Sequence, residues 1–171
     1  NENGDVVPHA YLRSDMQGTL YQQMLPVRVV DYTPPVAVMI VIDTSGSMSS
    51  SVPQAKRGAE QVLDALTSRD FCGVMTFSDS ASETVQVLPA SQKEKIREII
   101  RNIPEDGSGG TVFADAIRKA GAALSTVEVS RKHIIMVSDG VVDDEDEKVY
   151  TDFIRANREK GITLSIVGVY V

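Results

Sequence analysis

Three apolar segments of strand length are continuous rather than alternating, and this pattern restricts the possible folds more than any other feature. Residues 36–42, 71–77 and 133–137 contain no Asp, Glu, Lys or Arg. A strand with one face in water alternates polar and apolar residues, whereas a strand covered on both faces is apolar throughout. The chain is therefore expected to form a sheet that is buried on both faces.

Segments between these strands carry apolar residues at helical spacing. Residues 83–88 alternate instead, which fits a half-exposed edge strand after 71–77. Ser91 and Glu94 form a potential capping box for the helix that follows. A last apolar strand is expected at 162–171. The expected order is β-α-β-β-α-α-β-α-β, with helices near 55–66, 91–103, 112–124 and 149–161.

This alternation predicts an α/β fold: a doubly wound, mostly parallel sheet with one antiparallel edge strand and helices on both faces. Residues 1–35 break the pattern, because Gly and Pro punctuate them and only 27–30 is strand-like. We expect 1–35 to be a lead-in segment that packs on the domain formed by 36–171.

Charge and composition exclude several classes of partner. The 171 residues include 17 Lys and Arg and 24 Asp and Glu, so the net charge is −7. Such a chain is poorly suited to nucleic acid or to an anionic membrane surface, since both require basic side chains. No apolar run of about 20 residues is present, so we expect no membrane insertion of this fragment. The single cysteine, Cys72, excludes an internal disulfide framework.

Carboxylates directly follow two of the most apolar strands. Asp43 comes after 36–42, and Asp139 comes after 133–137. Ligands of open parallel sheets bind at the carboxyl ends of the strands. These two residues are therefore candidate site residues.

Hydroxyl side chains accompany the two carboxylates. Ser45 and Ser47 follow Asp43 in a tight turn, and Thr111 follows a glycine-rich loop. No thiol or imidazole joins them. Hard oxygen donors of this kind suit Mg²⁺, or Mn²⁺ or Ca²⁺, rather than zinc or copper.

The combined motif resembles a known site. Asp43-x-Ser45-x-Ser47, with Thr111 after its loop and Asp139 in Ser-Asp-Gly, is similar to the metal-ion-dependent adhesion site of von Willebrand factor type A (vWA) domains. The short first motif is common by chance, but three loops in this order are far more specific. The likeness covers residues 36–171.

This resemblance implies a function in protein binding. Ser45, Ser47 and Thr111 would hold one divalent ion through their hydroxyls, while Asp43 and Asp139 would act through waters and by orienting the hydroxyls. One position on the metal would remain for an Asp or Glu of a partner protein. No general base or nucleophile can be named beside these residues, so we do not expect an enzyme.

The resemblance also has departures. Members of the family normally continue past the last strand with a helix, a strand and another helix, so we expect a truncated domain with an open sheet edge. The lead-in segment and a second copy of the chain are the two candidates to cover that edge.

The segment before the first strand carries a fainter likeness. Tyr21 with 24–27 is similar to the approach to this domain in large bacterial membrane proteins that carry a glutamine-amidotransferase-like region. Because the chain begins at Asn1, we expect an excised or processed piece of a bacterial membrane-anchored protein.

Phosphotransfer is the main alternative, either as an enzyme or as a receiver-like domain that uses Asp43. A haloacid-dehalogenase-type phosphatase needs an acid two residues after the first Asp, and Ser45 occupies that position. A serine hydrolase needs a glycine two residues after its nucleophile, which the segment after Ser47 lacks. A structural domain with a vestigial site is the third interpretation, and the presence of all five ligand types argues against it.

Two further features have ordinary explanations. The acidic run 143–147 fits a solvated helix start, with a negative rim beside the metal as the alternative. Cys72 lies in an apolar strand and is expected to be buried and inert.

Overall fold

The structure, a computed structural model of the chain, describes residues 19–24, 33–79, 87–105, 107–140 and 147–169. The chain consists of two compact units, residues 1–33 and 34–171. The first contains helix α2, Leu20–Met24. No sequence pattern indicated this helix, because a helix of five residues is too short to produce a periodic pattern. The strand expected at 27–30 lies outside the described residues.

The second unit is an α/β domain around a five-stranded sheet of order β3-β2-β1-β4-β5. β1, β2, β4 and β5 run parallel, and β3 pairs antiparallel with β2 at one edge. This confirms the predicted fold class. The strands are β1 Val36–Asp43, β2 Phe71–Phe77, β3 Leu88–Pro89, β4 Arg131–Ser138 and β5 Ile162–Gly168.

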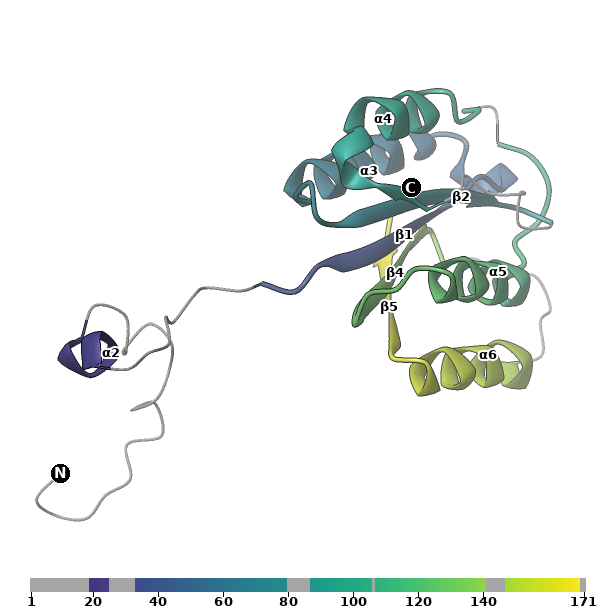
Figure 1. The fold of residues 1–171 in the computed structure, drawn as a ribbon. Coiled ribbons are helices and arrows are strands. Elements are labelled where there is room, and N and C mark those ends of the chain that lie inside the picture. Colours follow the sequence, from purple (N-terminus) through teal and green to yellow (C-terminus); the bar gives the residue numbers. More distant parts are fainter. Residues whose placement is uncertain (1–18, 25–32, 80–86, 106, 141–146, 170–171) are drawn as a thin grey trace, which may run out of the picture. The chain divides into compact units, whose positions relative to one another are not determined.

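The helices form a layer on each face of this sheet (Figure 1). α3 and α4 pack together on one face, and α5 and α6 pack together on the other. Two short 3-10 helices, η1 and η2, complete the domain. The helices are η1 Gly46–Met48, α3 Val52–Ala65, η2 Ala90–Gln92, α4 Lys93–Arg101, α5 Phe113–Ser125 and α6 Glu147–Glu159.

Strand β1 shows why its sequence is continuously apolar. Val38, Ile40 and Ile42 belong to the core beneath α3 and α4. The intervening residues, Met39 among them, belong to the core beneath α5 and α6. Side chains of a strand alternate between its two faces, so a central strand with two cores needs an apolar residue at every position.

The start of α4 differs from the prediction. The capping box expected from Ser91 and Glu94 does not form, because α4 is preceded by Gln92 without a side-chain cap. Ala90 is buried, and its N–H donates to the carbonyl of Asp70 at 2.8 Å. That bond holds the chain in η2, so Ser91 lies inside this short helix instead of at the N-cap of α4.

Two strands end at residues other than those expected. Most of the edge strand expected at 83–88 lies among residues outside the description, and β3 continues to Pro89. The last strand was expected to reach 171, but β5 ends at Gly168. Val169 follows as a buried residue outside the strand, with its N–H bonded to the carbonyl of Ser138 at 3.0 Å.

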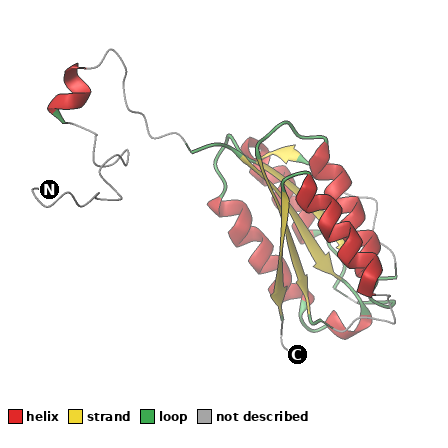
Figure 2. Cartoon of the chain, turned by 90° about the horizontal axis from the view of Figure 1, so that it is seen from below, coloured by secondary structure: helices red, strands yellow, loops and turns green. Residues whose placement is uncertain are grey.

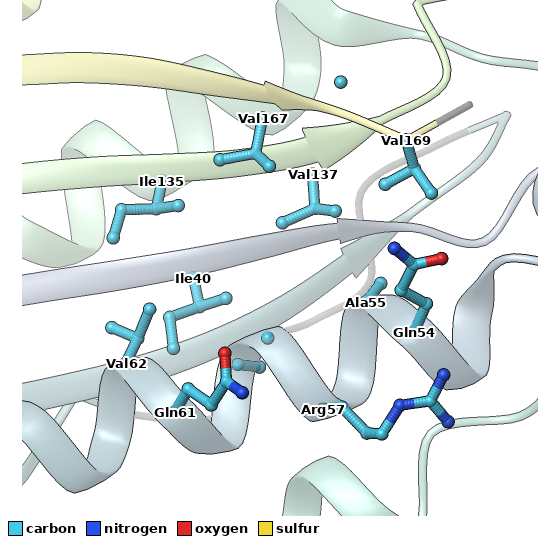
Figure 3. Close-up of a pocket in the computed structure, with 13 residues that line it drawn as sticks. Ile40, Gln54, Ala55, Arg57, Gln61, Val62, Ile135, Val137, Val167 and Val169 are labelled. Atoms are coloured by element: carbon cyan, nitrogen blue, oxygen red, sulfur yellow. The ribbon is translucent and has the colours of Figure 1, made fainter.

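An apolar groove of about 460 Å³ lies between α3 and the β4–β5 side of the sheet (Figure 3). Its walls include Val62 of α3, Val137 of β4 and Val167 of β5. Arg57 lies on its α3 side. In the described sheet β5 is an edge strand, with Val167 48% exposed. None of the described helices is long and apolar enough to cross a bilayer.

Candidate metal centre

The candidate site lies at the edge of the sheet where the parallel strands end. Their arrows point toward one edge in Figure 2. Asp43, the last residue of β1, pairs with Phe77, the last residue of β2. On the other side of β1, Ile42 pairs with Val137 of β4. The loops that follow these strands therefore begin side by side, as expected for a ligand site of an open parallel sheet.

Asp43 is fully buried and both of its carboxylate oxygens accept hydrogen bonds. The N–H of Ser45 donates to Oδ1 at 2.9 Å. The hydroxyl of Ser138 donates to Oδ2 at 2.6 Å. Bonds to an ionised acceptor are stronger than neutral ones, so they hold this charge inside the protein. Asp43 thereby fixes the turn after β1 and ties it to the end of β4.

The two serines of the first loop bring their hydroxyls together. Ser45 is buried and Ser47 is exposed, and their Oγ atoms are 3.2 Å apart. Two oxygens bound to Mg²⁺ at 2.0–2.1 Å and at right angles would be about 2.9 Å apart. The pair therefore already has nearly the separation of neighbouring ligands on one octahedral ion.

Thr111 lies in a loop that is bonded to the first loop. The N–H of Gly46 donates to the carbonyl of Gly109 at 3.1 Å, and the N–H of Ser108 donates to the carbonyl of Thr44 at 3.0 Å. Thr111 itself is buried. It is not the N-cap of α5, a role that Val112 takes without a side-chain bond.

Gly107 allows these two loops to approach. Its φ is +47°, a conformation that L side chains rarely adopt. A Cβ there would lie 2.8 Å from the carbonyl oxygen of Ser45. A larger residue would push the Thr111 loop away from the first loop.

Asp139 follows directly after β4 and is half-buried. Its neighbour Ser138 is fully buried and, besides donating to Asp43, accepts a hydrogen bond from the N–H of Gly140 at 3.0 Å. Gly140 has a φ of +82°, which turns the chain after Asp139. The hydroxyl of Ser138 thus fixes the Asp139 loop beside Asp43.

The structure therefore brings together the loops that carry all five residues of the predicted site. Sequence reasoning missed two residues that hold these loops, Ser138 and Asp79. Ser138 was noted in the Ser-Asp-Gly motif without a role, and its position before Asp139 was the available signal. Asp79 lies in a polar turn that offered none, yet its carboxylate accepts a hydrogen bond from the N–H of Gly110.

The chemistry of these side chains fits a hard divalent ion. Among the described residues, no three His, Cys, Asp or Glu side chains form a group that could hold a metal. A metal site here would thus depend on hydroxyl oxygens, which suit Mg²⁺, Mn²⁺ or Ca²⁺. Residues 143–146 of the acidic run 143–147 lie outside the described residues, and α6 begins at Glu147. The alternative interpretation of this run, a negative rim beside the metal, stays a prediction.

The cysteine and a strand histidine lie away from this edge. Cys72 is the second residue of β2 and is fully buried, which raises the pKa of its thiol to about 12. His133 is the third residue of β4, where burial lowers its pKa. Its Nδ1 lies 2.6 Å from Oγ1 of Thr163. Cys72 is buried as predicted, and the contact of His133 with Thr163 joins β4 to β5.

Comparison with known proteins identifies the fold family. Residues 38–141 match the von Willebrand factor type A domain. The chain belongs to this family. Its vWA domain therefore belongs to a class that generally mediates interactions between proteins, often with a metal.

Individual relatives agree with this assignment. The chain is 27% identical over 138 residues to protein YfbK of Escherichia coli, which covers 77% of this chain and 24% of YfbK. The crystal structure of BatB from Bacteroides thetaiotaomicron is 27% identical, with a TM-score of 0.66 over 78% of this chain and 66% of BatB. An aerotolerance-related membrane protein from Bacteroides fragilis, 23% identical, shares the fold with a TM-score of 0.67 over 78% of this chain and 67% of that protein.

These relatives are longer than the chain. It spans about a quarter of the length of YfbK and about two thirds of BatB. Any activity or partner assigned to the whole protein is therefore a proposal.

Proposed function

We propose that this vWA domain is a divalent-metal-dependent module that binds an acidic side chain of a partner protein. The observation that carries the proposal is that the carboxylate and the hydroxyls at this sheet edge have different surroundings. Both oxygens of Asp43 accept hydrogen bonds inside the protein, whereas the hydroxyls of Ser45 and Ser47 lie 3.2 Å apart. We therefore assign the neutral hydroxyls, rather than the carboxylates, as the direct ligands of the ion.

The roles of the five residues follow from this arrangement. Ser45, Ser47 and Thr111 would hold the ion, with Mg²⁺ as the first choice and Mn²⁺ or Ca²⁺ as alternatives. Asp43 and Asp139 would orient the hydroxyls and hold bound waters. Since neutral ligands leave most of the charge of a divalent ion uncompensated, a bound ion would supply an electrophilic position for an Asp or Glu of the partner. Ser47 is exposed, so it lies on the side open to a partner.

The geometry of Asp43 weighs against phosphotransfer. A phosphorylated Asp must present a free oxygen to its substrate, but Asp43 is fully buried and uses one oxygen for Ser45 and the other for Ser138. A binding role without catalysis is therefore the better proposal. Metal-dependent phosphoester hydrolysis that disappears in Asp43→Ala would contradict it.

Binding to a peptide array tests the proposal. The array pairs each Asp- or Glu-containing peptide with its Asn or Gln counterpart, and the domain is applied in Mg²⁺ or in EDTA. Ser91→Ala is a matched control for Ser47→Ala, because both serines are exposed and lie in short 3-10 helices. We expect wild type and Ser91→Ala to bind acidic peptides in Mg²⁺ alone and Ser47→Ala to bind none. Equal binding to the amide peptides, or binding that survives EDTA, would refute the proposal.

We further propose that the domain belongs to a bacterial protein that is attached to a membrane. The likeness in fold to the Bacteroides fragilis membrane protein supports this, and the chain spans only part of its relatives. Fractionation of source cells with an antibody to the domain would test it, with recovery in the soluble fraction alone as the contrary result.

Association of two copies through the edge strand β5 also stays a proposal, which sedimentation at increasing concentration would test.

A further inference from the structure

Thr111 lies between two main-chain N–H groups that are both held by the segment after β2. The N–H of Gly110 donates to Oδ1 of Asp79. The N–H of Val112 donates to the carbonyl of Ser78 at 3.0 Å. The position of Thr111 therefore depends on a segment that contributes none of the five proposed metal-site residues.

Asp79 differs from the main-chain partners of this loop because it acts through its side chain. The bonds of Gly46 with Gly109, of Ser108 with Thr44 and of Val112 with Ser78 all join main-chain atoms. No substitution of a side chain removes such a bond directly.

The absence of a side chain at Gly109 leaves room for the carboxylate of Asp79. Its φ is +83°, and a Cβ at this position would lie 2.4 Å from Oδ2 of Asp79. A side chain at 109 would therefore displace the carboxylate that holds Gly110. The conformation of the loop and the approach of Asp79 thus require the same glycine.

The loop needs such a contact because of its composition. Gly107, Gly109 and Gly110 lie within four positions of one another. Glycine has the largest conformational freedom of any residue, so a loop of this kind would sample many conformations if it were released. Apparent affinity falls in proportion to the fraction of molecules in the competent conformation.

We infer that Asp79 is a positioning residue that holds the loop of Thr111 in its metal-binding conformation through the N–H of Gly110. The inference rests on the proposed function, because it assumes that Thr111 holds the ion. Asp79 itself is exposed and acts through the main chain of its neighbour. It therefore adds a fourth segment, the turn after β2, to the three loops of the site.

Calorimetric titration with Mg²⁺ tests this role in four proteins. Asp79→Ala removes the acceptor, and Asp79→Asn keeps a carbonyl oxygen in its place while removing the charge. Glu128→Ala is the control, since Glu128 is exposed and precedes β4 at the opposite end of the sheet. Removing a residue that orients a metal ligand typically weakens the affinity for the metal by about 10- to 100-fold. We expect that loss in Asp79→Ala, a change below about threefold in Asp79→Asn, and no change in the control.

Amide hydrogen exchange of Gly110 in the metal-free proteins provides a second measurement. We expect exchange to accelerate in Asp79→Ala and to stay slow in wild type and Asp79→Asn. Wild-type affinity in Asp79→Ala would overturn the inference and leave the proposed function intact. Equal weakening in both Asp79 variants would also overturn it, because charge rather than the hydrogen bond would then be responsible. Absence of Mg²⁺ binding in wild type would instead refute the proposed function, and the inference with it.

Discussion

At the scale of single residues, carboxylates that bind main-chain N–H groups fix three irregular segments of this domain. Asp43 does so for the turn after β1, Asp79 for the loop of Thr111, and Asp70 for the turn before β2. Each is a short side chain next to an irregular segment, where main-chain donors lack partners within a helix or a strand. Substitution of these residues should therefore affect local order more than the cores of the sheet.

Asp70 links this role to acid stability. It accepts the N–H of Val36 at 2.9 Å, and both the N–H and the hydroxyl of Thr67 at 2.7 Å. Burial alone would raise the pKa of Asp70, but these hydrogen bonds outweigh it and the pKa lies below its ordinary value. A lowered pKa in the folded state stabilises the protein above the unfolded value of about 4, and this contribution is lost as pH falls through the folded value.

We expect Asp70→Asn to lower the free energy of unfolding near neutral pH by about 1.5 to 3 kcal/mol, the range for hydrogen bonds to charged groups. Its stability should then fall less than that of wild type as the pH drops below about 4. Urea unfolding across that range measures both effects, with exposed Glu128→Gln as control. Parallel acid profiles for wild type and Asp70→Asn would contradict the assignment.

Cys72 should be unreactive in the folded protein. With its pKa raised to about 12 by burial, only about one thiol in ten thousand would be ionised near pH 8, and the side chain is fully buried. We expect a disulfide reagent such as DTNB to label Cys72 at the rate at which the domain unfolds. Rapid stoichiometric labelling without denaturant would contradict this.

At the scale of elements, the order of strands and helices could be predicted because each central strand is a continuous apolar run. The same reasoning failed at Ser91, where a long-range bond from Ala90 to Asp70 overrides a local capping signal. It also missed Asp79, which meets Gly110 across 31 residues of sequence. A single Asp in a polar turn carries no pattern that specifies such a partner. The five candidate site residues were named because their spacing resembles a known motif, and their role in metal binding stays a prediction.

Two helical glycines offer a matched test of helix packing. A Cβ at Gly58 in α3 would meet nothing within 4 Å, whereas a Cβ at Gly121 in α5 would lie 2.0 Å from Oδ1 of Asn157 in α6. Asn157 is buried, and its Nδ2 donates to the carbonyl of Ile117 at 3.2 Å. Asn157 would therefore have to leave this position to admit a methyl group.

We expect Gly58→Ala to raise the free energy of unfolding by about 0.5 to 1 kcal/mol, because alanine loses less entropy in a helix. Gly121→Ala should lower it by about 1 to 3 kcal/mol through overpacking. Urea unfolding of both variants measures the difference. Effects of the same sign would show that the close approach of α5 and α6 at Gly121 does not limit stability.

At the scale of the whole molecule, the candidate metal site exists only in the folded domain. Its residues come from the loop after β1, the loop before α5 and the loop after β4, which are far apart in sequence. In the unfolded chain these groups do not converge, so an ion that needs all of them binds the folded state alone. Such binding must stabilise the entire domain.

Thermal unfolding with Mg²⁺ and with EDTA measures this linkage. At a concentration one hundred times Kd, binding to the folded state contributes about 2.7 kcal/mol. One kcal/mol shifts Tm by about 2 to 4 °C in domains of about 150 residues, so we expect a rise of roughly 5 to 11 °C. Ser47→Ala should unfold at nearly the same temperature with and without Mg²⁺, because it lacks one of the hydroxyls that hold the ion. Ser91→Ala, a serine in η2 at the start of α4, should show the full rise of wild type. An unchanged Tm for wild type in saturating Mg²⁺ would mean that the three loops, although they meet, do not form a metal site.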